Sequence, residues 1–524
     1  MKKLITSILI ITATGVVLFA QSPKREMRAA WLHTVNFSTW VSEVRVPAFN
    51  GSNEAEREAA RTAQKKAIIT YFDSFKAANL NAVFFHVRTT CDAFYKSKYE
   101  PWSHFLSTER GADPGWDPLE FAIEEAHKRG MELHAWLNPY RISFGQAQSE
   151  AATSPKDYIN THRHWVMAYS DNVKILNPGL PEVTERIADV VEDIIINYNV
   201  DGITLDDYFY ADNQGGLNNF PGKYFYLDAD LYNAYKAENP DGLSQGDWRR
   251  ANCNKMVKAI YDRIQSIKPW VIFGMSPAGV AKEGAKGIGI EPPSITALDW
   301  QWDQIYCNPL AWLVEGSVDY ISPQIYWTTK HATAPYGPLA EWWSKVCAKY
   351  NVYFYPSHSF IADTLEMGVQ INMNRKYDKL NAPGVVVWSA QSLMKRDRET
   401  QILSKGDHVF YLARNHFKYK ALPPALHWKK AEEQGMVDNL TLFGQTLSWS
   451  YGKGNVRYAI YAIPNSQIDD PNALSNPAYL LGISYEKKFT LPAGIVATHC
   501  IAVSVLDRYG NEFLPARTKS WIKK

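Results

Sequence analysis

Eight short β-rich runs alternate with helical patterns between Arg28 and about Ala421, and this alternation constrains the fold most. Such alternation predicts a parallel sheet covered by helices, and the simplest closed arrangement of eight strands is a (β/α)8 TIM barrel. A doubly wound α/β sheet is the competing fold, but it would carry a Gly-rich phosphate-binding turn after an early strand, and the sequence has none. The runs are residues 28–35, 81–88, 131–138, 202–207, 271–276, 319–326, 352–356 and 384–389, with helical patterns such as 119–129 and 182–198 between them.

The predicted barrel, residues 21–421, is much longer than the ~250 residues that such a barrel usually needs. The additional residues follow the second to fifth strands, at 89–118, 139–175, 208–254 and 277–318. These segments begin at the C-terminal ends of strands, where barrel enzymes build their active sites. The sequence therefore predicts a deep or extended site at that end of the barrel.

The pattern changes after Pro423 and Pro424, which indicate a stiff linker. Short alternating runs follow at 446–450, 456–462, 479–484 and 500–506, with turn signals such as Gly452-Lys453-Gly454 between them. Runs of this kind predict a small β-sandwich of fibronectin type III or immunoglobulin type over residues 425–524.

The N-terminus has the pattern of a secretory signal peptide over residues 1–20. Lys2 and Lys3 precede an uncharged apolar run from Leu4 to Phe19, and Ala20 is a suitable last residue before cleavage. We therefore expect a protein that is secreted or periplasmic in a bacterial cell envelope, with no membrane span after cleavage. An uncleaved N-terminal anchor is the alternative. The five cysteines are dispersed, and we expect buried structural thiols.

Aromatic residues are the compositional bias of this chain of 524 residues. Phe, Trp and Tyr make up 13%, including 18 Trp and 30 Tyr. Such side chains provide flat apolar faces with polar edges, which suit sugar rings as well as barrel cores. The formal net charge of +2 argues against nucleic acid as a partner, because phosphate contacts need an excess of basic residues.

The fourth strand carries the most informative polar residues. Strand alternation places Ile203 and Leu205 toward the helices, so Thr204 and Asp206 face the barrel interior. Asp206 is the last residue before the mouth, and Asp207 begins the loop. Glycosidases use carboxylates at such positions, normally in pairs. Asp206 and Asp207 are therefore the predicted catalytic residues, although adjacent strand residues point to opposite faces; capping of the loop by one of them is the structural alternative.

Other strand ends and adjoining loops also carry polar and aromatic residues. Polar groups in a barrel interior cost free energy unless they are paired or used, so several in one layer indicate a site. Satisfied core hydrogen bonds are the alternative for any one of them. The predicted substrate-binding residues are His86, Arg88, Trp136, Asn138, Tyr140, Arg141, Tyr208, Gln324, Tyr326, Trp327 and Trp388.

Two other patterns are weaker. His162 and His164, with His134 and His358, resemble a metal-binding set, but the His-Glu-x-x-His arrangement is missing and we predict no metal. Ser276 ends the fifth strand without the Gly-x-Ser-x-Gly elbow of a serine nucleophile, so we expect it to line the site.

Together, these segments resemble the glycosyl-hydrolase-like 10 family of bacterial envelope proteins. The matching segments run in order through about three quarters of the chain. They are Arg28-Ala-Ala-Trp-Leu, Leu80-Asn-Ala-Val-Phe-Phe-His-Val-Arg88, Gly115-Trp-Asp-Pro-Leu119, His134-Ala-Trp-Leu-Asn-Pro-Tyr-Arg141, Leu176-Asn-Pro-Gly179, Asp201-Gly-Ile-Thr-Leu-Asp-Asp-Tyr-Phe-Tyr210 and Asp319-Tyr-Ile-Ser-Pro-Gln-Ile-Tyr326.

The resemblance implies a (β/α)8 barrel with a fibronectin-like C-terminal domain and action on polysaccharide, some members cleaving peptidoglycan glycan strands that lack peptide. The start of the fourth strand also resembles chitinase-type barrels. The general acid of those enzymes, a Glu, would fall at Tyr208, so their mechanism does not transfer intact.

We therefore expect a glycoside hydrolase that acts on an N-acetylated glycan without an organic cofactor. Asp206 would act as nucleophile, base or transition-state stabiliser, and Asp207 would be the acid, with Glu283, Asp303 and Asp92 as rivals. A non-catalytic glycan-binding protein on a glycosidase-like barrel is the main alternative, and a metal-dependent deacetylase is a third.

Overall fold

The computed structural model describes residues 22–34, 38–41, 44–48, 53–145, 154–206, 208–211, 228–359, 364–397, 399 and 402–518. The predicted signal peptide at residues 1–20 lies outside this part of the chain. Within the described part, no helix is both long enough and apolar enough to cross a membrane.

Nine strands form one parallel sheet, in the order β10-β9-β8-β7-β3-β2-β1-β12-β11. The sheet is curled, because β10 and β11, at the two ends of this order, are separated in the chain only by Tyr355 and Pro356. Each of the eight strand runs predicted between residues 28 and 389 contributes a strand to this sheet. The strands are β1 (Met27–Leu32), β2 (Ala82–Arg88), β3 (Glu132–Leu137), β7 (Gly202–Asp206), β8 (Ile272–Ser276), β9 (Tyr320–Ile321), β10 (Tyr353–Phe354), β11 (Ser357–Ser359) and β12 (Gly384–Trp388).

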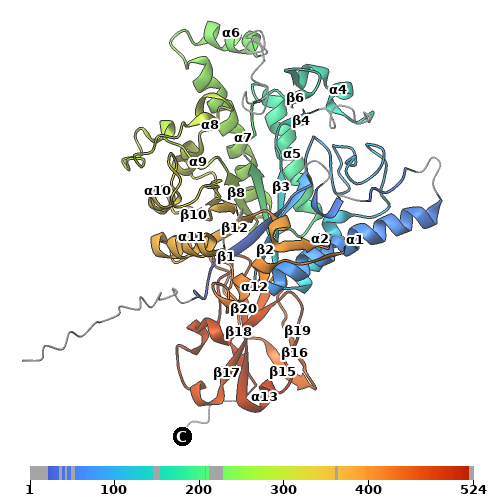
Figure 1. Cartoon of the computed structure of the whole chain (residues 1–524), viewed down its shortest axis with the longest axis vertical. Helices are drawn as coiled ribbons and strands as arrows, with labels where there is room; N and C mark the ends of the chain where they lie inside the picture. The colour runs from blue at the N-terminus through green and yellow to red at the C-terminus, as the bar shows by residue number, and fades with distance from the viewer. Residues whose placement is uncertain are drawn as a thin grey trace, which may run out of the picture.

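Helices surround the outer face of the sheet, as Figure 1 shows. Helix α2 illustrates how the sequence sets a helix start: Asp117 accepts hydrogen bonds from the backbone N–H groups of Leu119 and Glu120, and Pro118 occupies the first turn. The helices that follow or cover the strands are α1 (Glu54–Ala77), α2 (Pro118–Lys128), α5 (Pro181–Asn197), α7 (Gln245–Ile267), α9 (Pro309–Glu315), α10 (Tyr336–Lys349), α11 (Thr364–Tyr377) and α12 (Asp407–Arg414).

The two faces of the sheet bury different side chains. Ile203 and Leu205 pack in the large apolar core beneath the helices, as the strand alternation predicts. A second cluster fills the inner face and is largely aromatic. Its central residue, Trp31, lies edge-on to Phe84 and Trp136, with ring centroids 4.8 and 4.9 Å apart. The inner face is therefore packed with rings rather than open.

The long segments after the strands contain secondary structure of their own. The segment after β3 forms a three-stranded antiparallel sheet of β4 (Arg141–Phe144), β6 (Val173–Leu176) and β5 (Val166–Ala168), with α4 (Tyr158–Thr161) beside it. The segments after β7 and β8 include α6 (Ala229–Glu238) and α8 (Trp300–Asp303). A hairpin of β13 (Met394–Arg396) and β14 (Leu403–Lys405) precedes α12.

The C-terminal residues form two further sheets, drawn below the main sheet in Figure 1. They contact the N-terminal ends of the main strands, where Tyr485 donates a hydrogen bond to Asp201 at 3.2 Å and stacks on His127 at 3.7 Å. The fibronectin type III assignment stays a prediction. The strands are β15 (Asp438–Phe443), β16 (Thr446–Ser450) and β19 (Lys488–Thr490) in one sheet, and β18 (Leu480–Ser484), β17 (Arg457–Pro464), β20 (His499–Leu506) and β21 (Ala516–Arg517) in the other, which α13 (Ile495–Thr498) adjoins.

Candidate active site

Asp206 ends β7 and is buried, with 5% of its surface exposed. It pairs in register with Ser276, the last residue of β8. On the other side, Asn138 directly follows β3 and donates a hydrogen bond from its side-chain amide to Oδ2 of Asp206. Three neighbouring strands therefore end around one carboxylate, which is the arrangement that the sequence predicts for Asp206 and Asn138.

Burial raises the pKa of Asp206 from 3.8 to about 6. The positive charge of Arg141, the Tyr208 backbone N–H and the Asn138 amide lower this pKa, but they do not compensate for the loss of water around the carboxylate. Oδ1 of the same group is buried and has no hydrogen-bond partner within the described part of the chain. Asp206 thus has one oxygen held by Asn138 and one buried oxygen that makes no hydrogen bond within the described part of the chain.

A second layer of contacts fixes Asn138. Nε2 of His86 lies 2.8 Å from Oδ1 of Asn138, and Nδ1 of His86 lies 3.3 Å from the hydroxyl of Thr34. The His86 ring also stacks on Trp136, with centroids 3.7 Å apart and planes 11° apart. Burial lowers the pKa of His86 to about 3, so the imidazole is neutral at physiological pH. His86 is therefore placed to orient Asn138.

Aromatic faces continue from Trp136 toward solvent. Trp388, at the end of β12, lies 6.1 Å from Trp136 and stacks on Tyr326 at 6.1 Å, and both Trp388 and Tyr326 are half-buried. Tyr208 is 38% exposed and lies against the guanidinium of Arg141 at 4.8 Å. Gln324 donates a hydrogen bond to the carbonyl of Ser276 at 3.1 Å, next to the Asp206 pair. These residues join one cluster around Asp206.

His33 belongs to the same cluster, although the sequence reasoning did not select it. Its ring stacks on Trp388 at 5.1 Å, its pKa is lowered to about 4 by burial, and its buried Nδ1 has no hydrogen-bond partner among the described residues. The signal was present in the sequence, because Trp31 and His33 share the parity of the inward-facing positions.

Arg88 is not placed to contact a sugar. It is fully buried, and its guanidinium binds both carboxylate oxygens of Glu100, at 2.6 and 2.8 Å, and the carbonyl of Pro139. The register of β2 and β3 shifts between His86 and Arg88, so the alternation that predicts an inward Arg88 breaks at this irregularity. Arg88 instead holds the loop after β2 against the loop after β3.

Two further predicted residues pack away from Asp206, in the apolar core beneath the helices. Tyr140 is fully buried there and lies edge-on to Phe209 at 5.9 Å. Trp327 is partly buried against the same core, and its carbonyl accepts a hydrogen bond from Gln370 at 3.0 Å. Both residues follow the end of a strand, where strand alternation no longer fixes direction.

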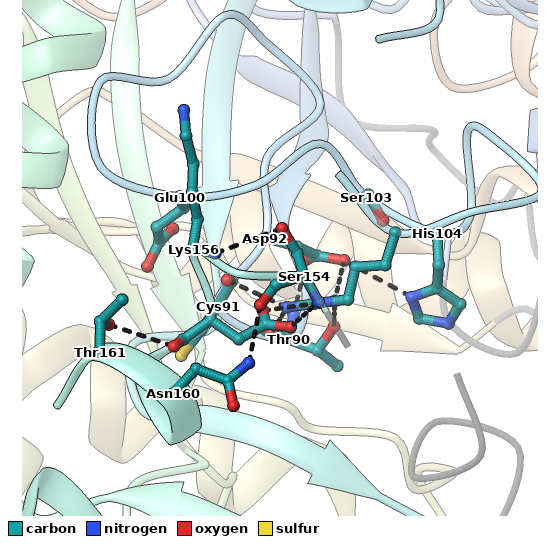
Figure 2. Close-up of polar contacts among 12 residues, drawn as sticks. Thr90, Cys91, Asp92, Glu100, Ser103, His104, Ser154, Lys156, Asn160 and Thr161 are labelled. Atoms are coloured by element: carbon teal, nitrogen blue, oxygen red, sulfur yellow. Dashed lines mark hydrogen bonds and ion pairs between the residues drawn. The ribbon is translucent and has the colours of Figure 1, made fainter. Parts of the chain in front are cut away.

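The candidates for a second carboxyl are spread over different environments. Asp207 lies outside the described residues. Asp92 is buried, and Figure 2 shows it beside Thr90 and His104. Asp92 also pairs with Arg110 at 3.1 Å, and this charge holds its pKa well below the ordinary range despite burial. Asp92 is thus unsuited to donate a proton.

The other two rivals are open to solvent. The side chain of Asp303 is 78% exposed, and Glu283 is exposed. Both carboxyl groups are therefore in contact with water rather than enclosed by the protein as Asp206 is. As for metals, the described residues contain no group of three or more His, Cys, Asp or Glu side chains that could hold an ion.

Comparison with known proteins decides the family. The family model described as Glycosyl hydrolase-like 10 matches residues 26–377, which is more than half of the chain. The chain belongs to this family. Its glycosyl hydrolase-like character is therefore shown, and the matched segment includes β1 to β11 with Asp206, Asn138 and His86.

Two curated relatives of this family member are named as hydrolases. Glycosyl hydrolase DigH of Escherichia coli (strain K12) is 36% identical over 334 residues, covering 62% of this chain and 71% of DigH. Glycosyl hydrolase YngK of Bacillus subtilis (strain 168) is 36% identical over 333 residues, covering 63% and 60% of the two chains. A more distant likeness is to the PgaB (BpsB) glycoside hydrolase domain from Bordetella bronchiseptica, with 10% identity, a TM-score of 0.41, and coverage of 70% of this chain and 94% of that one.

Proposed function

We propose that this protein hydrolyses glycosidic bonds in a polysaccharide and that Asp206 is its central catalytic carboxylate. The observation that carries the proposal is the state of Asp206: a buried carboxylate at the end of a parallel strand, with a pKa of about 6 and one oxygen unpartnered among the described residues. Half-buried aromatic faces, which suit sugar rings, lie in the same cluster.

The ionised form of Asp206 performs the reaction in this proposal. Cleavage of a glycosidic bond develops positive charge on the sugar ring, and a carboxylate beside the ring stabilises that charge or takes part in the displacement. Because the site is removed from water, the attraction is stronger than it would be in solution. A second carboxyl must protonate the leaving oxygen, and Asp207 is our candidate for this step.

Peptidoglycan glycan strands that lack peptide, or a similar N-acetylated glycan, are the proposed substrate. The family resemblance and the predicted export signal at residues 1–20 support this choice. The same reasoning supports a location in the bacterial envelope. We also propose that the curled sheet closes as a (β/α)8 barrel and that residues 425–524 are a fibronectin type III-like domain that holds the barrel near its polymer.

A specific observation favours one alternative, glycan binding without cleavage. The described side chains that interact with Asp206 are Trp136, Asn138 and Arg141, and none of these is a carboxylic acid. A site with a single carboxylate would hold a sugar ring and leave its glycosidic bond intact.

One experiment separates the two functions. Purified residues 21–524 are incubated with peptide-free peptidoglycan strands, and the soluble products are identified by mass spectrometry while bound protein is measured by co-sedimentation. Hydrolysis predicts shortened saccharides from the wild type. Intact strands that carry the protein into the pellet would show that the protein binds the polymer without cleaving it. If the protein neither releases saccharides nor co-sediments with the strands, this polymer is excluded as the substrate.

A further inference from the structure

A groove lies at the end of the main sheet opposite Asp206. One part is a cavity of about 680 Å³ between the N-terminal ends of the strands and the C-terminal sheets, and a second cavity of about 850 Å³ lies between α1, β14 and α12. Both are lined by Lys76, Asn79 and Lys420, so they adjoin. We call the two together the basal groove.

The basal groove is lined by more cationic than acidic side chains, although the whole chain has a net charge of only +2. Six Lys and Arg side chains line it against two acidic ones, Asp73 and Glu486. Those two acids already pair with Arg129 and Lys488 at 2.8 and 2.9 Å. Lys128 and Arg129 also pair with Glu125, outside the lining, at 2.8 and 2.6 Å. The positive charge that remains in the groove is therefore that of Lys76, Lys405 and Lys420.

Lys420 is the centre of this charge. Nothing in the described part of the chain forms an ion pair or hydrogen bond with the ammonium groups of Lys76, Lys405 or Lys420. Burial and the neighbouring charge of Lys76 lower the pKa of Lys420 to about 8, so it stays protonated at neutral pH. Its Nζ lies over Gly482 of β18, where a Cβ atom would be only 3.4 Å away. Lys420 is half-buried, whereas Lys76 and Lys405 are exposed. A partly desolvated cation beside a second cation costs free energy, and a bound anion would offset that cost.

The shape and the remaining lining indicate what kind of anion fits. Two adjoining cavities are too large for a single inorganic ion, and the unpaired ammonium groups are distributed across both. Thr446, Thr490 and Phe489 line the wall formed by the C-terminal strands. Ammonium groups form ion pairs with carboxylates or phosphates, and hydroxyl groups form hydrogen bonds with sugar hydroxyls. An aromatic ring stacks on the face of a sugar.

We propose that the basal groove is a second, non-catalytic binding site for an anionic polysaccharide, and that Lys420 and Lys76 bind its carboxylate or phosphate groups. This site is independent of hydrolysis at Asp206, because it lies at the opposite ends of the strands. It would hold a strand of polymer between the main sheet and the C-terminal sheets.

The test uses the full chain and polygalacturonate oligosaccharides as a linear carboxylated glycan, with affinity measured by isothermal titration calorimetry. We expect binding that weakens with salt, and a loss of about tenfold or more in affinity for the Lys76→Met/Lys420→Met variant. Lys345→Met is the matched control, because Lys345 is an exposed lysine on α10, outside both cavities, and pairs with Glu341 at 2.7 Å. Its affinity should equal that of the wild type.

Other outcomes overturn the proposal. Equal affinity of the double variant and the wild type would show that Lys76 and Lys420 do not bind the oligosaccharide. Inorganic phosphate that binds as tightly as the oligosaccharide would indicate a small-anion site, and binding to phosphatidylglycerol vesicles without binding to polygalacturonate would indicate a lipid surface instead. Melting curves show whether the double variant folds, since the loss of one half-buried and one exposed unpaired cation should not lower its melting temperature.

Discussion

The side-chain amide of Asn138 donates a hydrogen bond to Asp206, and His86 holds the carbonyl oxygen of the same amide at 2.8 Å. This chain of contacts runs across the ends of three strands, β2, β3 and β7. It fixes one oxygen of the carboxylate and leaves the other without a partner in the described part of the protein. The site therefore orients Asp206 before any substrate arrives, which is the kind of preorganisation that catalysis requires.

The pKa of Asp206 predicts the acid side of the activity profile. Since the ionised form acts in our proposal, kcat/KM should fall as the pH drops through about 6, where the carboxylate gains a proton. The charge of Arg141 opposes that protonation, so Arg141→Met should raise the pKa and move the fall in kcat/KM to higher pH. Arg141→Lys retains the charge and should leave the profile near that of the wild type. Superimposable profiles for Arg141→Met and the wild type would contradict this account.

The same pKa predicts a stability gain when the charge is removed. Asp206 binds its proton more tightly in the folded state than in the unfolded state, so its contribution to stability is present below pH 4 and lost as the pH rises through 6. At pH 7.5, the free energy of unfolding of Asp206→Asn should therefore be about 1–3 kcal/mol larger than that of the wild type, so that the variant is more stable. Denaturant titrations at pH 4 and pH 7.5 measure this, and a gain that is equal at both values would show that ionisation is not its cause.

A buried ion pair joins the C-terminal sheets to the main sheet. Arg457 of β17 binds Glu132 at the start of β3, and both side chains are buried. Arg457→Met removes the ion-pair partner of the Glu132 carboxylate and leaves it a contact with His134 at 3.3 Å, which should cost about 3–5 kcal/mol of unfolding free energy. Adding Glu132→Gln to this variant removes the stranded charge and should recover much of the loss. A double variant as unstable as the sum of the two single variants would show that the pair is not coupled.

Strand periodicity explains which parts of this structure are predictable from sequence. The eight runs and the inward direction of Trp136 and Asp206 follow from alternation within unbroken strands, and the structure has them. Arg88 departs from the pattern because the register shifts just before it. Trp327 lies outside any strand, because β9 ends at Ile321 and Pro323 follows it. The register shift before Arg88 leaves no sign in a single sequence, whereas Pro323 is a visible signal that the strand ends early.

The sequence also does not show which charged side chains are buried and which of them form ion pairs. The sequence places Asp92 on a long loop among candidate acids, but its pairing with Arg110 depends on how two distant parts of that loop fold together. The basal groove is a similar case, because α1, Lys420 and the C-terminal strands meet only in the folded chain. Whether a charged side chain can act on a ligand therefore depends on the ion pairs that it forms in the folded protein, and its residue type alone does not show this.

The most direct test of the central claim is the hydrolysis rate of Asp206→Asn on peptide-free peptidoglycan strands, with products counted by mass spectrometry. The control is Asp262→Asn, which removes a carboxylate from the exposed face of α7, where Asp262 pairs with Lys258 at 2.6 Å. We predict that Asp206→Asn loses about a hundredfold or more in rate while remaining folded, and that Asp262→Asn matches the wild type. A folded Asp206→Asn variant that cleaves strands at the wild-type rate would contradict the assignment of Asp206 as the catalytic carboxylate.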